Sequence, residues 1–425
     1  MIHLYVGPTL PPEEALLHNP ALRVLPPVGH GDLFDPEIAA GDTVVIIDGV
    51  YHHAAALRHK EIMAIMHRGV RVIGASSIGA LRARELYPYG MCGVGTIYHA
   101  YLTGQITADD EVAVGQDPDT GRALTWPLVT CRYVISLARE QRVITSREAS
   151  GLMEALRGIY YPQRTAAVVR AVCRRHGTSA FIDWVDERRA AEPHFGDIKH
   201  ADALQAVHTA QYGPDLCRSV PRERHFDTGY FLRWSNHFAA RNIDGLGLPT
   251  ALCLLYQQVF DPKFPEVWNR HLEQLSRHPA DAGPGMPLAE RLAHLTGEDA
   301  GGTLPVHAAF RIPVDLRDTE TVARLLACET GPDRMSILRY LAANDDARRA
   351  TPGFLPETIN DSRAVRTLCG LWRCKFSGLE DAAAARGLRS AAHAIDAVKV
   401  FLAGFFRDQA ELAPETKMEA APYEY

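Results

Sequence analysis

Two adjacent serines, Ser76 and Ser77, lie where an apolar run gives way to a helical pattern. Residues 70–73 have strand character, and residues 80–85 are rich in helix formers. The small residues between them allow a tight turn that presents a side chain beside the first amides of the helix. With Gly79, Ser77 forms a relaxed nucleophile elbow suited to acyl transfer. The alternative is that Ser76 or Ser77 only caps the helix, a task for which serine is well suited.

A carboxylate and several bases accompany this serine corner. Asp48 closes an apolar strand, where a carboxylate either faces a cleft or stabilises a turn. His59 and Lys60 follow near the start of a helix, with His52 and His53 in the loop before it. Histidine is the usual general base near neutral pH, and a lysine with a lowered pKa can serve a serine. The alternative is that these groups are solvated, packed or capping residues.

The first 90 residues alternate short apolar strands with helical stretches. The strand signals cover residues 2–6, 22–25, 43–47 and 70–73, and the helical segments lie around residues 12–18, 33–39 and 54–67. This alternation predicts an α/β fold, a Rossmann-like parallel sheet with crossover helices. Ligands bind such sheets outside the carboxyl ends of the strands. Gly7 and Pro8 after the first strand, Asp48 after the third and Ser77 after the fourth are therefore expected at one edge.

Further charged residues flank these elements. Asp109, Asp110 and Glu111 precede the apolar residues 112–114, which we interpret as a strand. Charge runs are usually solvated, but a carboxylate at this place can also orient a base or hold a metal. Arg82 either pairs with Glu85 on the same helix or reaches a carboxylate at the rim of the cleft.

Composition narrows the class of protein. The chain has 425 residues, of which 47% are hydrophobic and 23% charged, as expected for a globular protein of two or three domains. Its net charge of -6 gives no electrostatic reason to expect nucleic acid or an acidic membrane surface as the main partner. The eight cysteines contain no CxxC pair, so neither a disulfide framework nor a zinc knuckle is predicted, and no metal site is expected.

The same features indicate a cytoplasmic protein. A reducing compartment fits the scattered cysteines, and the N-terminus lacks the pattern of a signal peptide. The longest apolar run near the end, residues 400–406, is far shorter than the ~20 residues that span a bilayer.

From about residue 110 the pattern becomes helical. Thr145 and Glu148 have the spacing of a capping box before an apolar stripe of Leu152, Met153, Leu156 and Ile159. Breaks rich in proline and glycine at 279–287 and 297–305 indicate loops, and Ile395, Val398, Leu402 and Phe405 indicate one face of a last helix. We expect an α/β domain with helical completion over residues 1–214 and a mainly α-helical domain of unknown role over residues 215–425.

The N-terminal half resembles the TfuA-like family. The blocks YVGPTL, IIDGVYHHAAALRHKEI, GVRVIGASSIGALRARELYPYGMCGVGTIYHAYLTGQI and DDEVAV agree with it in order and spacing, and IYYPQRT and DIKHADAL match weaker blocks. The resemblance covers about residues 1–210. It implies a partner of YcaO enzymes, which use ATP and magnesium to activate a peptide amide oxygen so that sulfide replaces it. No cofactor is therefore expected in this chain itself.

The resemblance also implies a reaction. TfuA-like proteins are implied to supply sulfide by hydrolysing the C-terminal thiocarboxylate of a ubiquitin-like sulfur carrier protein. Ser77 would attack the carbonyl, with His59 as the preferred base, Lys60 as the second choice, and Asp48 or Glu111 orienting the base. Amides near Ile78 and Gly79 would hold the oxyanion. The residues expected around the substrate are Gly7, Pro8, Ser76, Ile78, Gly79, Arg82 and Glu111.

Three alternatives stay open. Water activated by Asp48 or His59 can attack directly, without an acyl-enzyme. The chain can be a non-catalytic docking or allosteric subunit of a YcaO complex, and the basic and aromatic stretch 218–234 suits an interface. It can also be a small-molecule serine hydrolase, although the downstream Asp and His of that class are not evident. The thioamidated substrate is expected to be a ribosomally made peptide natural product, so a precursor peptide is a further candidate partner.

Overall fold

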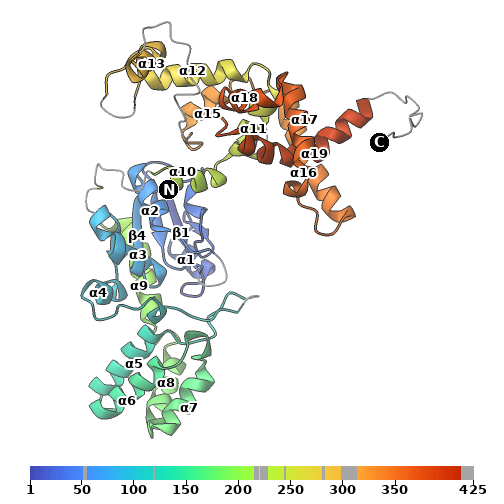
Figure 1. Cartoon of the computed structure of the whole chain (residues 1–425). Helices are drawn as coiled ribbons and strands as arrows, with labels where there is room; N and C mark the ends of the chain where they lie inside the picture. The colour runs from blue at the N-terminus through green and yellow to red at the C-terminus, as the bar shows by residue number, and fades with distance from the viewer. Residues whose placement is uncertain are drawn as a thin grey trace. The chain divides into compact units, whose positions relative to one another are not determined.

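The computed structural model describes residues 1–50, 55–117, 120–214, 220, 228–243, 246–279, 283–297 and 314–412. The chain divides into two compact units, Met1–Thr228 and Gly229–Tyr425 (Figure 1). We call them unit 1 and unit 2.

Unit 1 is built on a five-stranded sheet with the strand order β2-β1-β3-β4-β5. The strands are β1 (Ile2–Tyr5), β2 (Arg23–Leu25), β3 (Thr43–Ile46), β4 (Arg71–Ala75) and β5 (Cys92–Val94). All neighbouring strands are parallel. Tyr5 pairs with Ile46 and Ile46 with Gly74, so the segments after β1, β3 and β4 emerge side by side. The predicted parallel sheet with crossover helices is confirmed.

Helices cover both faces of this sheet. Val45, Ile47 and Ile73 pack in one hydrophobic cluster with alanines of α9 (Ile198–Tyr212). Gly74 points to the opposite face, where a Cβ would lie 2.1 Å from the carbonyl oxygen of Gly79 in α3 (Ile78–Leu86). Right-handed crossovers place α2 (His59–His67) on the same face as α3. The shorter helices α1 (Pro12–His18) and α4 (Thr96–Leu102) complete this layer structure.

Four further helices give unit 1 a second hydrophobic core. They are α5 (Leu128–Glu140), α6 (Ser146–Arg157), α7 (Ala166–Arg175) and α8 (Ser179–Ala191) (Figure 1). The predicted capping box is present, since Thr145 and Glu148 each accept from the other's backbone amide. Leu152 and Leu156 are buried in this core, and Met153 and Ile159 pack against it. The predicted apolar stripe is therefore confirmed.

Unit 2 is mainly helical, as predicted. Its elements are α10 (Gly229–Ser235), β6 (Ala240–Ile243), β7 (Leu246–Pro249), α11 (Thr250–Phe260), α12 (Phe264–Arg277), α13 (Leu288–Thr296), α15 (Thr319–Leu325), α16 (Gly331–Ala350), α17 (Asp361–Trp372), α18 (Leu379–Ala384) and α19 (Ala391–Leu412). The antiparallel pair β6 and β7 is an addition to the predicted pattern.

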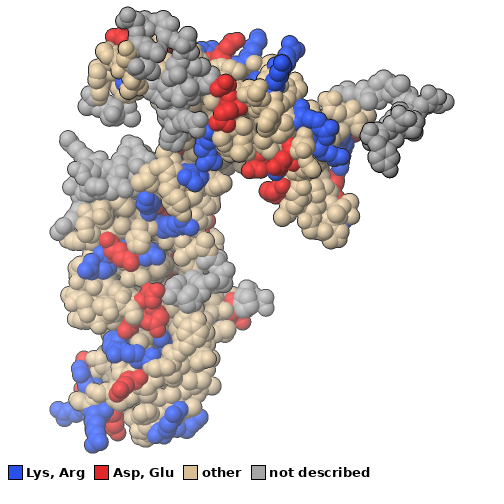
Figure 2. Space-filling model, in the orientation of Figure 1, with Lys and Arg blue, Asp and Glu red and all other residues tan. Residues whose placement is uncertain are grey.

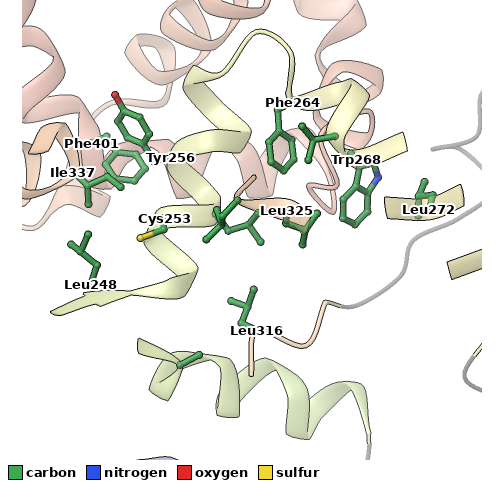
Figure 3. Packing of buried hydrophobic residues seen from close by; sticks show 14 of the residues in the cluster. Leu248, Cys253, Tyr256, Phe264, Trp268, Leu272, Leu316, Leu325, Ile337 and Phe401 are labelled. Atoms are coloured by element: carbon green, nitrogen blue, oxygen red, sulfur yellow. The ribbon is translucent and has the colours of Figure 1, made fainter. Parts of the chain in front are cut away.

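Aromatic and aliphatic side chains form the hydrophobic core of unit 2. Figure 3 shows Tyr256 of α11 beside Phe401 of α19, and Phe264 beside Trp268 on α12. The rings of Tyr256 and Phe401 meet edge to face with centroids 5.7 Å apart, a favourable arrangement. Val398 and Leu402 lie buried in a neighbouring cluster, which confirms the predicted apolar face of the last helix.

Some local predictions are wrong. Residues 33–39 contain only the end of a short 3-10 turn, η1 (Asp32–Phe34), instead of a helix. Residues 112–114 form no strand, because the acidic run before them turns as η3 (Asp109–Glu111) and the chain continues without regular structure. Cys92 is disulfide-bonded, although the sequence predicted no disulfide framework.

Other features concern the surface. On the face seen in Figure 2, Lys and Arg are interspersed with Asp and Glu over both units. Within the described ranges, no helix is long and apolar enough to cross a membrane. Residues 218–219 and 221–227 of the basic and aromatic stretch lie outside the described residues, as do His52 and His53.

We predict that Gly74→Ala destabilises unit 1 by about 3 kcal/mol or more. The added methyl group would lie 2.1 Å from the Gly79 carbonyl oxygen and 2.7 Å from Met91 Cε, so β4 and α3 would have to separate. Urea denaturation followed by circular dichroism measures the loss. Gly158→Ala is the matched control, because its φ is -68° and its nearest neighbour would lie at 3.6 Å. Equal stabilities of the two variants would contradict the close packing.

Candidate active site

The carboxylate of Asp48 ties together the segments after β1 and β3. Its Oδ2 accepts from the backbone amides of Gly7 at 2.9 Å and Thr9 at 3.0 Å, and its Oδ1 accepts from the Thr9 hydroxyl at 2.7 Å. Asp48 is buried. Three short hydrogen bonds hold a carboxylate firmly and fix the loop that carries Pro8. The geometry therefore favours positioning over proton transfer for Asp48.

A buried lysine from α9, the last described helix of unit 1 in the sequence, lies near the same carboxylate. Lys199, in the first turn of α9, places its Nζ 3.9 Å from Asp48 Oδ1 and donates to the Val112 carbonyl at 3.0 Å. Burial lowers the pKa of Lys199, while the negative charge of Asp48 acts in the opposite direction. A buried charge is costly unless it is paired and hydrogen-bonded. Lys199 and Asp48 therefore each limit the cost of burying the other.

The serine corner contains backbone strain. Ser76 has a φ of 63°, and the Ser77 amide donates to the Ala75 carbonyl at 2.7 Å, so Ser76 is the central residue of a γ-turn. This turn is rare for a residue with a side chain, because positive φ brings Cβ close to the backbone. The Ser76 hydroxyl, fully buried, donates to the Lys199 carbonyl at 2.8 Å. Helix α9 thus holds the strained corner in place.

Ser77 occupies the N-cap position of α3 without performing the cap. Its side chain makes no capping hydrogen bond, and within the described residues its hydroxyl has no hydrogen-bond partner. The Gly79 amide donates to the Ile47 carbonyl at 3.3 Å, and a Cβ on Gly79 would lie 1.8 Å from the Ile46 carbonyl oxygen. Gly79 therefore serves close packing of α3 on β3. Of the two amides expected to hold the oxyanion, the Gly79 amide already has an acceptor. The Ile78 amide has none in the described part of the chain and is the one that can donate to an oxyanion.

Ser77 and Asp48 line one cavity of about 620 Å³ at the carboxyl edge of the sheet. This volume lies within the range of small-molecule and peptide-tail sites. Its described lining residues are Pro8, Pro27, Asp48, Gly49, Val50, Ser77, Ile78, Asp109, Val112, Ala113, Val114, Gly115, Gln116, Asp117, Tyr161 and Pro162. The structure thus brings together Pro8, Asp48, Ser77 and Ile78 as the sequence suggested.

The predicted bases lie elsewhere in the described structure. His59 Nε2 is 2.7 Å from Glu85 Oε2, which also accepts from Arg82 at 2.5 Å. Burial alone would raise the pKa of Glu85, but the hydrogen bond from His59 and the charge of Arg82 outweigh it and lower that pKa. Lys60 donates to the Thr228 hydroxyl at 3.1 Å. None of these side chains is among the described lining residues of the cavity.

The acidic run divides among three tasks. Asp109 lines the cavity, Asp110 pairs with the buried Arg164 at 3.0 Å, and Glu111 pairs with Arg132 at 2.7 Å. Glu111 is buried instead of solvated. The run therefore contributes one carboxylate to the cavity, and its other two attach η3 to the helical part of unit 1.

A second buried carboxylate, that of Asp202 in α9, lies near the carboxyl edge of the sheet. Asp202 accepts from the amides of Thr96 and Ile97, both at 2.8 Å, at the start of α4. Gly95, with a φ of 96°, allows this approach, because a Cβ there would lie 2.3 Å from Asp202 Cγ. Burial raises the pKa of Asp202 to about 6 against the effect of these hydrogen bonds. Asp202 attaches α9 to α4.

Lys199 and Asp202 fall in the block DIKHADAL, but the sequence did not indicate their roles at the sheet edge. A usable signal was present in the composition of α9. Ala203, Ala206 and Ala210 give this helix a small-residue face that packs on the sheet, and a charged residue beside such a face must find a buried partner. Glu61, in the same helix as His59 and Lys60, is also fully buried and accepts from the Gly31 amide at 2.7 Å.

Comparison with known families supports the resemblance. The model of the TfuA-like protein family matches residues 48–165. This segment is TfuA-like. It begins at Asp48, contains the serine corner and the acidic run, and ends just after the cavity residues Tyr161 and Pro162. No curated protein matches the chain.

The TfuA-like segment does not include every residue that supports the cavity. Pro8 and Thr9 precede it, and Lys199 and Asp202 follow it. Unit 2 lies wholly outside it. The family match therefore covers the described cavity residues from Asp48 to Pro162, while Pro8, Pro27 and the supporting residues of α9 lie outside it.

We predict a pH dependence of unit 1 stability that Asp202 causes. Its pKa in the folded state, about 6, lies above the ordinary value of 3.8, so the folded state binds its proton more tightly than the unfolded state does. The contribution is fully present below about pH 4 and is lost as pH rises through about 6. The loss amounts to roughly 3 kcal/mol.

Urea denaturation at pH 4, 5, 6 and 7 measures this slope. Asp202→Asn should lose one hydrogen bond at every pH and should lack the slope that Asp202 contributes. An unchanged slope in Asp202→Asn would show that another group is responsible.

Proposed function

We propose that this chain supplies sulfide to a YcaO enzyme for peptide backbone thioamidation. It would do so by hydrolysing the C-terminal thiocarboxylate of a ubiquitin-like sulfur carrier protein. The TfuA-like match over residues 48–165 supports the association with YcaO chemistry. In this proposal ATP and magnesium act in the YcaO partner, and the peptide is a ribosomally made natural product precursor.

The observation that carries the proposed hydrolysis is the state of Ser77. Its hydroxyl has no hydrogen-bond partner within the described residues, Ser77 is the N-cap residue of α3, and it lines a cavity of about 620 Å³. The neighbouring Ser76 is fully buried and engaged with Lys199, so the two serines have separate tasks. The positive end of the α3 dipole and the Ile78 amide suit an oxyanion that forms beside Ser77.

The reaction that fits this arrangement is an acyl transfer to Ser77. The Oγ atom attacks the thiocarboxylate carbon, the carbon–sulfur bond breaks, and the serine proton ends on sulfur, so hydrosulfide leaves. Water then cleaves the ester, which releases the carrier with an ordinary carboxylate and regenerates Ser77. Each turnover thus consumes one thiocarboxylate and one water and yields one carboxylate, one hydrosulfide and one proton.

A proton carrier between Oγ and sulfur has to reach the cavity. Asp48 lines it, but three hydrogen bonds occupy its oxygens. Asp109 lines the same cavity as Ser77 and is therefore our preferred proton carrier. His59 can take this role only after leaving Glu85, from which its Nε2 lies 2.7 Å.

We predict that Ser77→Ala abolishes sulfide release without loss of stability. The assay uses a purified thiocarboxylated carrier without the YcaO partner and measures free sulfide and carrier mass. Removal of the nucleophile should lower the rate at least roughly 100-fold. Because the Ser77 hydroxyl makes no hydrogen bond with the described part of the chain, the melting temperature should stay close to that of wild type.

The adjacent serine provides the matched control. Ser76→Ala loses the hydrogen bond to the Lys199 carbonyl and should cost about 1 kcal/mol of stability, while activity is retained below the melting temperature. Equal activity of Ser77→Ala and wild type would exclude an acyl-enzyme on Ser77. Wild-type release no faster than the carrier's own hydrolysis would overturn the hydrolase proposal and leave the docking subunit as the alternative.

We predict that the two candidate proton carriers differ in their effect. Asp109→Asn should lower kcat for sulfide release at least roughly tenfold, because it removes a cavity carboxylate. His59→Gln should change kcat by less than about threefold, since His59 lies outside the described lining and pairs with Glu85. A collapse in His59→Gln with full activity in Asp109→Asn would show that the histidine reaches the cavity during turnover.

A further inference from the structure

A cluster of two histidines and one glutamate lies in unit 1 away from the Ser77 cavity. Glu14 comes from α1, His200 from the first turn of α9, and His194 from the segment between α8 and α9. One ligating atom of each side chain lies within 4.8 Å of those of the other two. None of the three is among the described lining residues of the cavity. The proposed hydrolysis therefore does not use this cluster.

The contacts within the cluster hold its side chains close together. His200 Nε2 is 2.8 Å from Glu14 Oε1, and the His194 and His200 rings stack with centroids 3.8 Å apart and an angle of 8°. The backbone amide of His200 donates to Asp197 Oδ1, which caps α9 and fixes the start of the helix. His200 is buried and His194 is exposed. An ion from solvent thus meets an accessible ligand first and a firmly held one behind it.

The donor set selects one class of ion. Two imidazoles and one carboxylate are a known set for zinc, and imidazole also suits the other late first-row divalent metals. Calcium and magnesium prefer sites made wholly of oxygen ligands. Three protein ligands leave one position of a tetrahedral ion for water.

We propose that Glu14, His194 and His200 form a binding site for a Zn²⁺-class divalent ion. The ion replaces the proton between His200 Nε2 and Glu14 Oε1, and His194 tilts out of its stack to supply the third ligand.

The position of the site gives binding a structural consequence. Glu14 lies in the helix that follows Thr9, and His200 follows Lys199 directly. Thr9 and Lys199 both contact Asp48. An ion held between α1 and α9 would thus link two segments that position Asp48. Because the folded chain binds the ion better than the unfolded chain does, metal should raise the melting temperature of unit 1.

The test uses the full chain without a polyhistidine tag. Titration with Co²⁺ followed by visible absorption, and with Zn²⁺ followed by calorimetry, should give one equivalent bound, with the absorption of a tetrahedral site. His194→Ala and Glu14→Gln should each weaken binding at least roughly tenfold. His194 is exposed, so its replacement should leave the melting temperature of the metal-free chain nearly unchanged.

His208→Ala is the matched control. His208 is an exposed residue of the same helix whose ring contacts Tyr212, outside the cluster, so this variant should bind metal like wild type. Glu14→Gln keeps a hydrogen-bond acceptor for His200 and tests the site with less disturbance. No binding at millimolar metal, or equal binding by wild type, His194→Ala and Glu14→Gln, would overturn the proposal.

Discussion

The buried carboxylate of Asp48 is the constraint on which the active-site edge depends. It lies at the end of β3, the central strand, and its partners come from the loop after β1 and from α9. A buried charge that loses its partners is strongly destabilising, because the desolvation cost remains while the compensation is lost. The loop after β1 and the start of α9 are therefore held relative to β3. The positions of Pro8 and Val112 in the cavity follow from that restraint.

The serine corner also depends on α9, through the backbone carbonyl of Lys199. Lys199 uses its side chain toward Asp48 and its carbonyl toward the Ser76 hydroxyl. Strained backbone at a single residue costs about 1–3 kcal/mol and persists only where the surroundings hold it. The close approach of Gly79 to the Ile46 carbonyl supplies the second restraint, because α3 can start only in this place. The position of Ser77 at the cavity thus depends on contacts of its neighbours Ser76 and Gly79.

Much of this arrangement could be predicted from local sequence. The strands β1, β3 and β4 are short apolar runs ended by small or polar residues, so their boundaries and their shared edge could be read directly. The strand β5 escaped notice because its three residues include Cys92 and Gly93, which carry little strand signal. The positions of Glu61, Glu111 and Lys199 could not be read in this way. Each is a charged residue whose burial depends on partners that the fold supplies, such as Arg132 for Glu111.

The distribution of the site over the chain bears on what unit 2 contributes. Every described residue that lines the cavity belongs to unit 1. Unit 2 has hydrophobic clusters made of its own residues, including the aromatic group of Tyr256, Phe264 and Phe401. A unit with its own core can keep its fold while unit 1 carries out chemistry. The acyl chemistry proposed for Ser77 therefore uses residues of unit 1 among those that the structure describes.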